Sequence, residues 1–171
     1  MNDHPWFAPT ASAEVKPIPW LHPDAVEYFD TILQPGWDVL EHGSGGSTLW
    51  LAERVRSVVS VEHTEEWRAK IRELAPANVT MLSDMPAGIF KYDLMFIDGE
   101  RAKRGLCLDL APSLVVPGGW VVLDNANRPE YRDEREAFSR KARLVRRFEN
   151  NIPTSKYFVT EFWRCVSEST P

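Results

Sequence analysis

Acidic side chains stand at the ends of five successive apolar runs in the sequence. They are Glu41, Glu62, Asp84, Asp98 and Asp124. Carboxylates can hold a cationic amino group, accept hydrogen bonds from sugar hydroxyls, bind a metal cation or take up a proton. Asp and Asn are common in turns after strands, which explains one or two of these positions but explains all five poorly. The series therefore predicts a ligand site along one edge of a sheet.

The first of these acids opens a glycine-rich junction, "VLEHGSGGSTLWLA", residues 39–52. Glycines let a backbone approach a ligand closely, and Ser47 and Thr48 can cap the helix that follows. No Lys follows the glycines, which excludes a Walker A loop, and Thr48 stands where a dinucleotide fingerprint requires its third glycine. Glu41 would repel a pyrophosphate and attract a cationic amino group, so the junction favours a ligand that carries such a group.

The second acid has a spacing that indicates a sugar. Glu62 ends the second apolar run, 17 positions after Gly45. An acid at the end of the second strand of a nucleotide-binding sheet can accept hydrogen bonds from the hydroxyls of a ribose. The two acids together predict a ligand with both a ribose and a cationic amino group.

The elements that must position these residues alternate between strand and helix. Alternation of this kind is typical of an α/β fold, a doubly wound sheet with helices on both faces. The short connection "NNIPTS" makes the last two strands an antiparallel pair, so the predicted sheet is mixed. We predict strands over 37–41, 57–62, 78–82, 92–97, 119–123, 144–149 and 157–164, and helices over 23–34, 47–56, 101–115 and 130–143, with one more between a Thr64 cap and Pro76.

Length and composition indicate one globular domain. The chain has 171 residues, of which 43% are hydrophobic and 26% charged, which is ordinary for a globular protein. Residues 1–20 hold four prolines and show no apolar period. We expect them to form an extended N-terminal arm ahead of a domain over 21–171.

Charge and cysteine content narrow the partners and the compartment. The net charge of −5 argues against nucleic-acid binding, although segment 128–147 holds eight Arg or Lys against four Asp or Glu. We expect that segment to be a solvated helix face. Cys107 and Cys165 have no metal-ligand spacing, which disfavours a disulfide framework or a zinc site and favours the cytoplasm. No signal pattern and no membrane-spanning apolar run is found, so no membrane partner is expected.

Four motifs of the chain resemble those of the class I S-adenosylmethionine-dependent methyltransferases. "LEHGSGGST" is similar to the first motif of that family, and "VVSVEH" to the second; "YDLMFIDG" and "VVPGGWVVLDN" resemble the motifs at the fourth and fifth strands. The resemblance spans residues 23–164. It implies a seven-stranded sheet in the order 3-2-1-4-5-7-6 with strand 7 antiparallel, and S-adenosylmethionine as the cofactor.

Carried onto this sequence, the resemblance assigns a part of the cofactor to each of the acids at the first three strand ends. Glu41 would meet the methionine amino group through backbone or water, Glu62 would hold the ribose, and Asp84 would reach the adenine amino group. His63 would lie beside the adenine ring. The implied cofactor set is Glu41, Gly43, Ser44, Gly45, Ser47, Thr48, Glu62, His63, Asp84 and Asp98.

A narrower likeness is to the metal-dependent catechol-type O-methyltransferases. Asp98, Asp124 and Asn125 match the residue types and places of that group's metal ligands, so the resemblance implies a Mg²⁺ site. The alternative is that Asp98 orients the substrate or cofactor and that Asp124 and Asn125 shape a turn. The group has a Lys base three residues after the first metal Asp, where this chain has Arg101, which cannot give up its proton at neutral pH. Asp98 and Arg101 are the candidate catalytic residues. Arg101 could bind an anionic substrate, or pair with Glu100 or Glu130.

The predicted function is methyl transfer to a small molecule, at oxygen. Two alternatives remain open: a nicotinamide-dependent oxidoreductase, which Glu41 and Thr48 disfavour, and a methyltransferase-like module that binds without catalysis. The sequence does not name the acceptor. A chain this short leaves little room for a separate substrate domain. The pocket would have to be completed by the arm, the loop after Asp124 and the connection between the last two strands, or by the second subunit of a homodimer.

Overall fold

The computed structural model describes residues 14–87, 90–149 and 159–166. Within this part of the chain, seven strands form a single sheet. Its order is β3-β2-β1-β4-β5-β7-β6. The strands are β1 (Asp38–His42), β2 (Ser57–Val61), β3 (Val79–Leu82), β4 (Tyr92–Ile97), β5 (Val115–Leu123), β6 (Ala142–Glu149) and β7 (Val159–Cys165).

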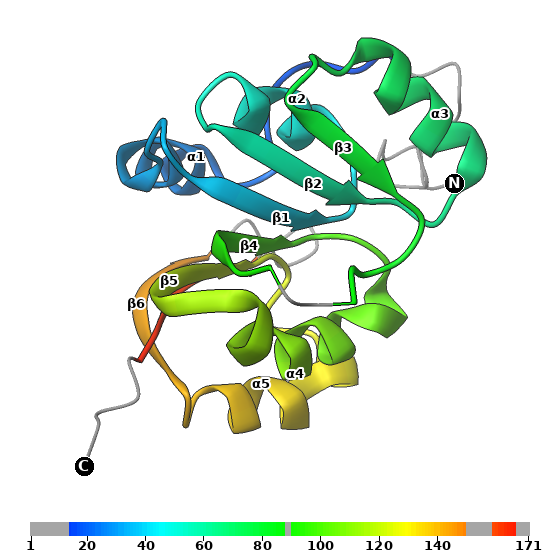
Figure 1. The fold of residues 1–171 in the computed structure, drawn as a ribbon. Coiled ribbons are helices and arrows are strands. Elements are labelled where there is room, and N and C mark those ends of the chain that lie inside the picture. The colour runs from blue at the N-terminus through cyan, green and yellow to red at the C-terminus, as the bar shows by residue number, and fades with distance from the viewer. Residues whose placement is uncertain (1–13, 88–89, 150–158, 167–171) are drawn as a thin grey trace.

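The first five strands are parallel, and β7 is antiparallel to both of its neighbours, β5 and β6. This confirms the predicted fold class, the strand order and the direction of the last pair. The carboxyl ends of β1 to β5 consequently lie along one edge of the sheet, to the right in Figure 1. The connection 150–155 and residues 1–13 of the expected arm lie outside the described residues.

The helices are α1 (Pro23–Ile32), α2 (Gly46–Ala52), α3 (Glu65–Leu74), α4 (Arg104–Leu114) and α5 (Arg132–Phe138), with 3-10 turns η1 (Arg101–Lys103) and η2 (Pro129–Tyr131). Helices α4 and α5 cover one face of the sheet, the lower face in Figure 1. Helices α1 and α2 pack on the other face through Ala25, Phe29, Trp50 and Leu51. None of the helices in the described ranges is long and apolar enough to span a membrane.

Strand periodicity assigns the side chains of β1 to the two faces. Val39 packs in the core cluster beneath α1 and α2, and Leu40 packs in the cluster beneath α4. Because successive side chains of a strand point to opposite faces, Glu41 shares the face of Val39 and His42 that of Leu40. The two functional candidates at the end of β1 therefore point in opposite directions.

The described part of the N-terminal arm packs on the domain at the start of α2. An added Cβ at Gly46 would lie 2.0 Å from the carbonyl oxygen of Lys16 and 2.7 Å from that of Ile18. Only glycine at position 46 leaves room for this backbone. The sequence did not predict where the arm would pack.

Several predicted boundaries were wrong. The helix predicted over 47–56 ends at Ala52, and the strand predicted over 119–123 begins at Val115. The helix predicted over 130–143 ends at Phe138, and β6 begins at Ala142, inside the predicted helix. The pairing of Ala142 and Arg143 with β7 supplies backbone hydrogen bonds that override the helix propensity of this Arg- and Lys-rich stretch. Segment 128–147 is consequently a short helix and an edge strand, not one solvated helix face.

Candidate functional site

Glu41 is fully buried at the end of β1, and its carboxylate accepts hydrogen bonds from three hydroxyls. The donors are Ser47 Oγ and Thr48 Oγ1 from α2 and Ser60 Oγ from β2, each at 2.5 Å. Burial raises the pKa of Glu41 to about 7, against the opposing effect of these hydroxyls. The Glu41 side chain thus ties β1, β2 and α2 together, and Ser47 and Thr48 face it.

The loop between Glu41 and α2 is fixed by further contacts of Thr48 and Ser44. Thr48 Oγ1 also accepts the backbone N–H of Gly45 at 2.9 Å, which caps the helix from within. Ser44 Oγ lies 2.6 Å from Ser60 Oγ, and the backbone carbonyl oxygen of Ser44 accepts the indole N–H of Trp67 at 2.8 Å. An added Cβ at Gly45 would meet nothing within 4 Å, so open space lies beside the loop at that position.

Gly43 holds the backbone in a conformation that other residues rarely adopt, with φ of +101°. An added Cβ there would lie 2.4 Å from Cα of Gly99, so the loop after β1 crosses the loop after β4 backbone against backbone. The neighbouring His42 ring is buried, and its Nδ1 has no hydrogen-bond partner among the described residues. Burial, with Arg104 and Lys103 nearby, lowers the pKa of His42 to about 4, so the ring is neutral at pH 7.

Glu62 is buried just after β2, and its carboxylate organises the turn into α3. Its Oε1 accepts the backbone N–H of Thr64 at 2.8 Å and lies 3.2 Å from Nδ1 of the half-exposed His63. Thr64 occupies the N-cap position as predicted, but its side chain makes no capping hydrogen bond. No described contact involves Oε2 of Glu62, which leaves that oxygen for a ligand.

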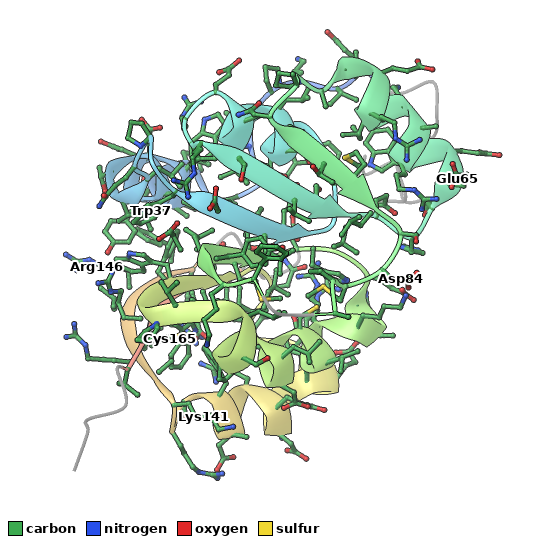
Figure 2. The ribbon with its side chains drawn as sticks, in the orientation of Figure 1. Trp37, Glu65, Asp84, Lys141, Arg146 and Cys165 are labelled. Atoms are coloured by element: carbon green, nitrogen blue, oxygen red, sulfur yellow. The ribbon has the colours of Figure 1, made fainter. Side chains whose placement is uncertain are left out.

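A pocket of about 240 Å³ lies at the carboxyl ends of β1, β2 and β3, and we call it the β1–β3 pocket. It is lined by His42, Gly43, His63, Asp84, Met85 and Lys103, among others. Asp84 is exposed at its rim, at the end of the sheet opposite Trp37 (Figure 2). Of the ten predicted cofactor residues, Gly43, His63 and Asp84 line this pocket, and Glu62 lies next to His63.

Asp98 follows β4 and is held by Arg104, the first residue of α4. The Arg104 side chain donates to the carbonyl oxygens of Asp98 at 2.6 Å, Gly99 at 2.9 Å and Asp124 at 2.6 Å. It also forms an ion pair with the Asp98 carboxylate. Burial raises the pKa of Asp98, and Arg104 opposes that rise.

Asp124 and Asn125 are buried after β5 and bond to each other and to their surroundings. Asp124 Oδ2 accepts from Asn125 Nδ2, and Oδ1 accepts from Thr160 Oγ1 of β7, both at 2.7 Å. Asn125 has a φ of +52°, and its carbonyl accepts from the Tyr131 hydroxyl. Burial and the nearby Asp98 raise the pKa of Asp124 to about 7.

This arrangement does not fit the expected Mg²⁺ site. Both oxygens of Asp124 accept protein hydrogen bonds, and Asn125 turns a donor, not an oxygen ligand, towards Asp124. The guanidinium of Arg104, a permanent cation, lies against Asp98 and within 3.5 Å of Asn125 Oδ1. No cluster of three His, Cys, Asp or Glu side chains suited to a metal was found in the described ranges. Asp98, Asp124 and Asn125 gather around an arginine where the sequence analysis expected a magnesium ion.

Arg101 lies outside this cluster. It is 58% exposed and pairs with Glu130 at 3.0 Å, which is one of the alternatives that the sequence left open. The arginine that holds Asp98 is Arg104, one helical turn further on. Sequence reasoning missed it because a charged residue at the start of a helix is ordinarily exposed. It also did not predict that His42 would line the pocket or that the Trp67 indole would donate to the Ser44 carbonyl oxygen.

The fold is shared with solved methyltransferases that act on different acceptors. An O-methyltransferase from Bacillus cereus, solved with SAH, aligns with a TM-score of 0.67 at 17% identity over 86% of this chain and 84% of its own. The N-methyltransferase NodS from Bradyrhizobium japonicum aligns at 0.65 and 12% over 78% and 88%. The tRNA methyltransferase TrmI from Aquifex aeolicus aligns at 0.64 and 16% over 86% and 70%.

No protein-family model matches the chain, and no curated protein matches it in sequence. At identities this low the structural likeness shows the fold. The chain has the class I S-adenosylmethionine-dependent methyltransferase fold.

Proposed function

We propose that this chain is an S-adenosylmethionine-dependent methyltransferase that acts at an oxygen atom of a small molecule. The β1–β3 pocket carries the proposal. It lies outside the carboxyl ends of parallel strands, where sheets of this kind bind nucleotides, and Gly43 brings bare backbone to its wall.

The residues around this pocket suit the cofactor. His42 Nδ1 is buried without a partner among the described residues, and an unpaired buried nitrogen favours a ligand that supplies one. Glu62 Oε2 is available to ribose hydroxyls, and Asp84 at the rim to the adenine amino group. The open space beside Gly45 leaves room for the methionine portion near the backbone of the loop.

A nicotinamide cofactor fits less well. The dinucleotide-binding sheet in its classic form has the order 3-2-1-4-5-6 without an inserted antiparallel strand, whereas β7 lies between β5 and β6 here. Thr48 stands at the third glycine position, and its hydroxyl bonds to the Glu41 carboxylate. These two observations favour S-adenosylmethionine.

Asp98 is the carboxyl best suited to receive the acceptor's proton. S-adenosylmethionine, when bound, supplies an electrophilic methyl group on a sulfonium sulfur. The side chain of Asp98 is 26% exposed, whereas Asp124 is buried with both oxygens engaged. Burial raises the pKa of Asp98, which makes its carboxylate a stronger base. Asp98 would orient the acceptor hydroxyl and take up its proton when the oxygen gains the methyl group.

Arg104, a cation of the chain itself, lies against Asp98, Asp124 and Asn125, so the proposed mechanism uses no Mg²⁺. Arg104 is a positioning residue: it holds the Asp98 backbone and carboxylate against the end of β5. Positioning supplies much of the rate of an in-line displacement. Neither a base function nor substrate binding is assigned to Arg101, because it pairs with Glu130.

The proposal keeps a small-molecule acceptor. The net charge of −5 disfavours a polyanionic partner such as tRNA. Cytoplasmic location and a homodimer that completes the pocket remain predictions.

Isothermal titration of the purified chain tests the cofactor. We expect S-adenosylhomocysteine and S-adenosylmethionine to bind at one site per chain and NAD to give no heat. Binding of NAD without binding of S-adenosylhomocysteine would contradict the proposal. The same method tests whether Mg²⁺ binds. Because Arg104 occupies the position between the candidate ligands, titration of MgCl₂ into the S-adenosylhomocysteine complex should give no saturable heat.

A further inference from the structure

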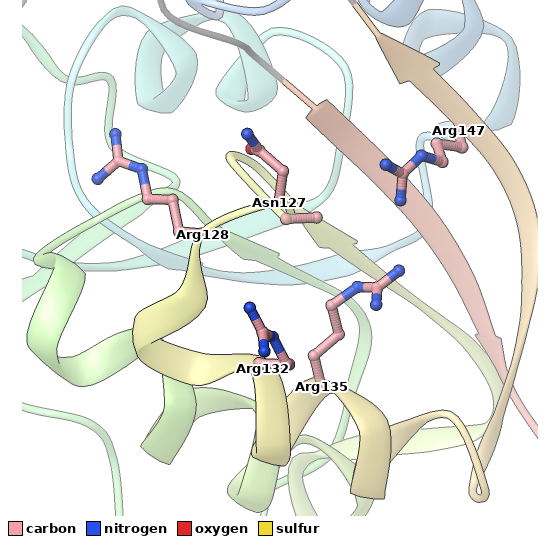
Figure 3. A pocket seen from close by; sticks show the side chains of 6 residues that line it. Asn127, Arg128, Arg132, Arg135 and Arg147 are labelled. Atoms are coloured by element: carbon pink, nitrogen blue, oxygen red, sulfur yellow. The ribbon is translucent and has the colours of Figure 1, made fainter.

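A second pocket, of about 260 Å³, is lined by four arginines. Its lining residues are Ala126, Asn127, Arg128, Arg132, Arg135 and Arg147, and we call it the arginine pocket. Figure 3 shows these side chains coming from three elements: the loop after β5, helix α5 and strand β6. The basic stretch that the sequence analysis assigned to a solvated helix face therefore surrounds a concavity.

Two of the four arginines are neutralised from within the protein. Glu161 of β7 is fully buried and accepts from Arg135 Nε at 2.7 Å and from Arg147 Nη1 at 2.6 Å. The Trp163 indole donates to the same carboxylate at 3.2 Å. Arg147 also pairs with Glu149. Arg135 and Arg147 form one wall and are held in place by this network (Figure 3).

The other two arginines have no such partner. The guanidinium groups of Arg128 and Arg132 make no hydrogen bond or ion pair with any described residue, although both backbone N–H groups are bonded. Arg128 is half-buried, and burial together with the neighbouring Arg104 and Arg101 lowers its pKa. Arg135 and Arg147 pair with Glu161 and Glu149, whereas the guanidinium groups of Arg128 and Arg132 are unpaired. The carboxyls of Asp98, Asp124 and Glu130 act on Arg128 only through longer-range attraction. Such a pocket suits an anion, because a guanidinium group that is partly desolvated, as that of Arg128 is, gains most from a charged acceptor.

The arginine pocket lies beside the reacting centre. Ala126 donates its backbone N–H to Val159 at 2.8 Å, which places the loop at the carboxyl end of β5. Arg128 is close enough to Asp98 to oppose the rise in its pKa. The two pockets thus lie along the same edge of the sheet, one at the ends of β1 to β3 and the other beyond β5. An acceptor in the arginine pocket would present its reacting oxygen towards Asp98.

We propose that the arginine pocket binds a phosphate monoester group of the acceptor, with Arg128 and Arg132 as its ligands. This inference rests on the proposed function and names the class of its acceptor. A phosphate monoester carries a charge of about −1.5 to −2 at pH 7, which matches two unpaired guanidinium groups better than the single charge of a carboxylate. The planar guanidinium fork suits the geometry of a phosphate.

Titration calorimetry with inorganic phosphate tests the pocket without knowledge of the acceptor. Sodium phosphate is titrated into the full chain at pH 7.5 and fixed ionic strength, with sodium acetate as the carboxylate probe. We expect saturable phosphate binding that weakens at least tenfold in the Arg128→Gln/Arg132→Gln double variant. Arg72→Gln is the matched control, because it removes one exposed arginine charge on α3, away from both pockets, and should leave the affinity unchanged.

Three results would overturn the assignment. They are the absence of phosphate binding, an equal loss in the Arg72→Gln control, and acetate binding as tight as that of phosphate. Tighter binding of a single-stranded RNA that depends on the same two arginines would also overturn it, in favour of a nucleic-acid acceptor. The single variant Arg132→Gln changes only an exposed side chain, so it tests the pocket even if the double variant is less stable.

A parallel titration with S-adenosylhomocysteine separates this inference from the function on which it rests. If that ligand binds and phosphate does not, the phosphate assignment fails and the methyltransferase proposal stands. If phosphate binds and S-adenosylhomocysteine does not, the proposed function fails. With both bound, methyl transfer from labelled S-adenosylmethionine should be detected in a panel of phosphorylated hydroxy compounds and should be lost in the same panel after dephosphorylation.

Discussion

Nη2 of Arg104 lies 3.0 Å from Oδ1 of Asp98, in an ion pair whose side chains are 5% and 26% exposed. The same guanidinium reaches the backbone of both loops that follow β4 and β5. It therefore joins the two strand ends that carry Asp98 and Asp124, and it does so from the first residue of α4.

Replacing Arg104 by Met should destabilise the fold. The substitution keeps an unbranched side chain that suits a helix but leaves a partly buried carboxylate and three carbonyl oxygens without their donor. We expect a loss of about 3 kcal/mol in the free energy of unfolding, at the low end for a broken buried ion pair. Urea denaturation followed by circular dichroism measures it. Arg101→Met is the control and should cost less than about 1 kcal/mol, because its pair with Glu130 is exposed. Equal losses in the two variants would contradict the role of Arg104.

Gly43→Ala should destabilise the protein and weaken cofactor binding together. The new Cβ would lie 2.4 Å from Cα of Gly99, and the backbone has a φ of +101°. Overpacking and left-handed strain each cost about 1–3 kcal/mol. Gly36→Ala is the control, since a Cβ there meets nothing within 4 Å. Thermal unfolding should show a lower melting temperature for Gly43→Ala only, and a melting temperature equal to that of Gly36→Ala would show that the two loops do not cross so closely.

The buried carboxyl of Glu41 should make stability depend on pH. Its pKa is raised from 4.5 to about 7, so between these values the folded protein holds the proton more tightly than the unfolded chain does. Glu41 therefore contributes stability that is complete below pH 4.5 and is lost as the pH rises through about 7. The upper bound of this contribution is about 3 kcal/mol.

Comparison with Glu41→Gln isolates this effect. His42 acts in the opposite sense because its pKa is lowered, and Asp124 acts in the same sense as Glu41, but both are present in wild type and variant. The difference in the free energy of unfolding, wild type minus variant, should fall between pH 5 and pH 7.5 and then level off. A difference that stays constant with pH would show that Glu41 titrates normally.

Glu62→Ala should weaken the binding of S-adenosylhomocysteine by about 1–3 kcal/mol, the scale of hydrogen bonds to a charged group. The control is Glu66→Ala, which removes an exposed acid from the first turn of α3, the helix that follows Glu62. Titration calorimetry on both variants measures the change. Unchanged affinity in Glu62→Ala would remove this residue from the site, and an equal change in Glu66→Ala would assign the effect to the net charge.

The sequence predicted the strands more accurately than the arginine contacts, for physical reasons. Strand β4 (Tyr92–Ile97) was predicted to the residue, because a near-continuous apolar run is typical of a strand covered on both faces. The end of α5 at Phe138 was missed, since only pairing with β7, distant in sequence, makes Ala142 part of a strand. The role of Arg104 was missed because burial of a charge depends on partners from two other loops.

The close approach of Gly43 to Gly99 also constrains how this chain can diverge. The contact joins backbone to backbone, so a side chain gained at one position cannot be offset by shrinking the other, which is already at its minimum. In an alignment of homologues, the two sites should accordingly show no compensatory covariation. Each glycine should be lost only in homologues whose two loops no longer cross because one of the loops has changed in length.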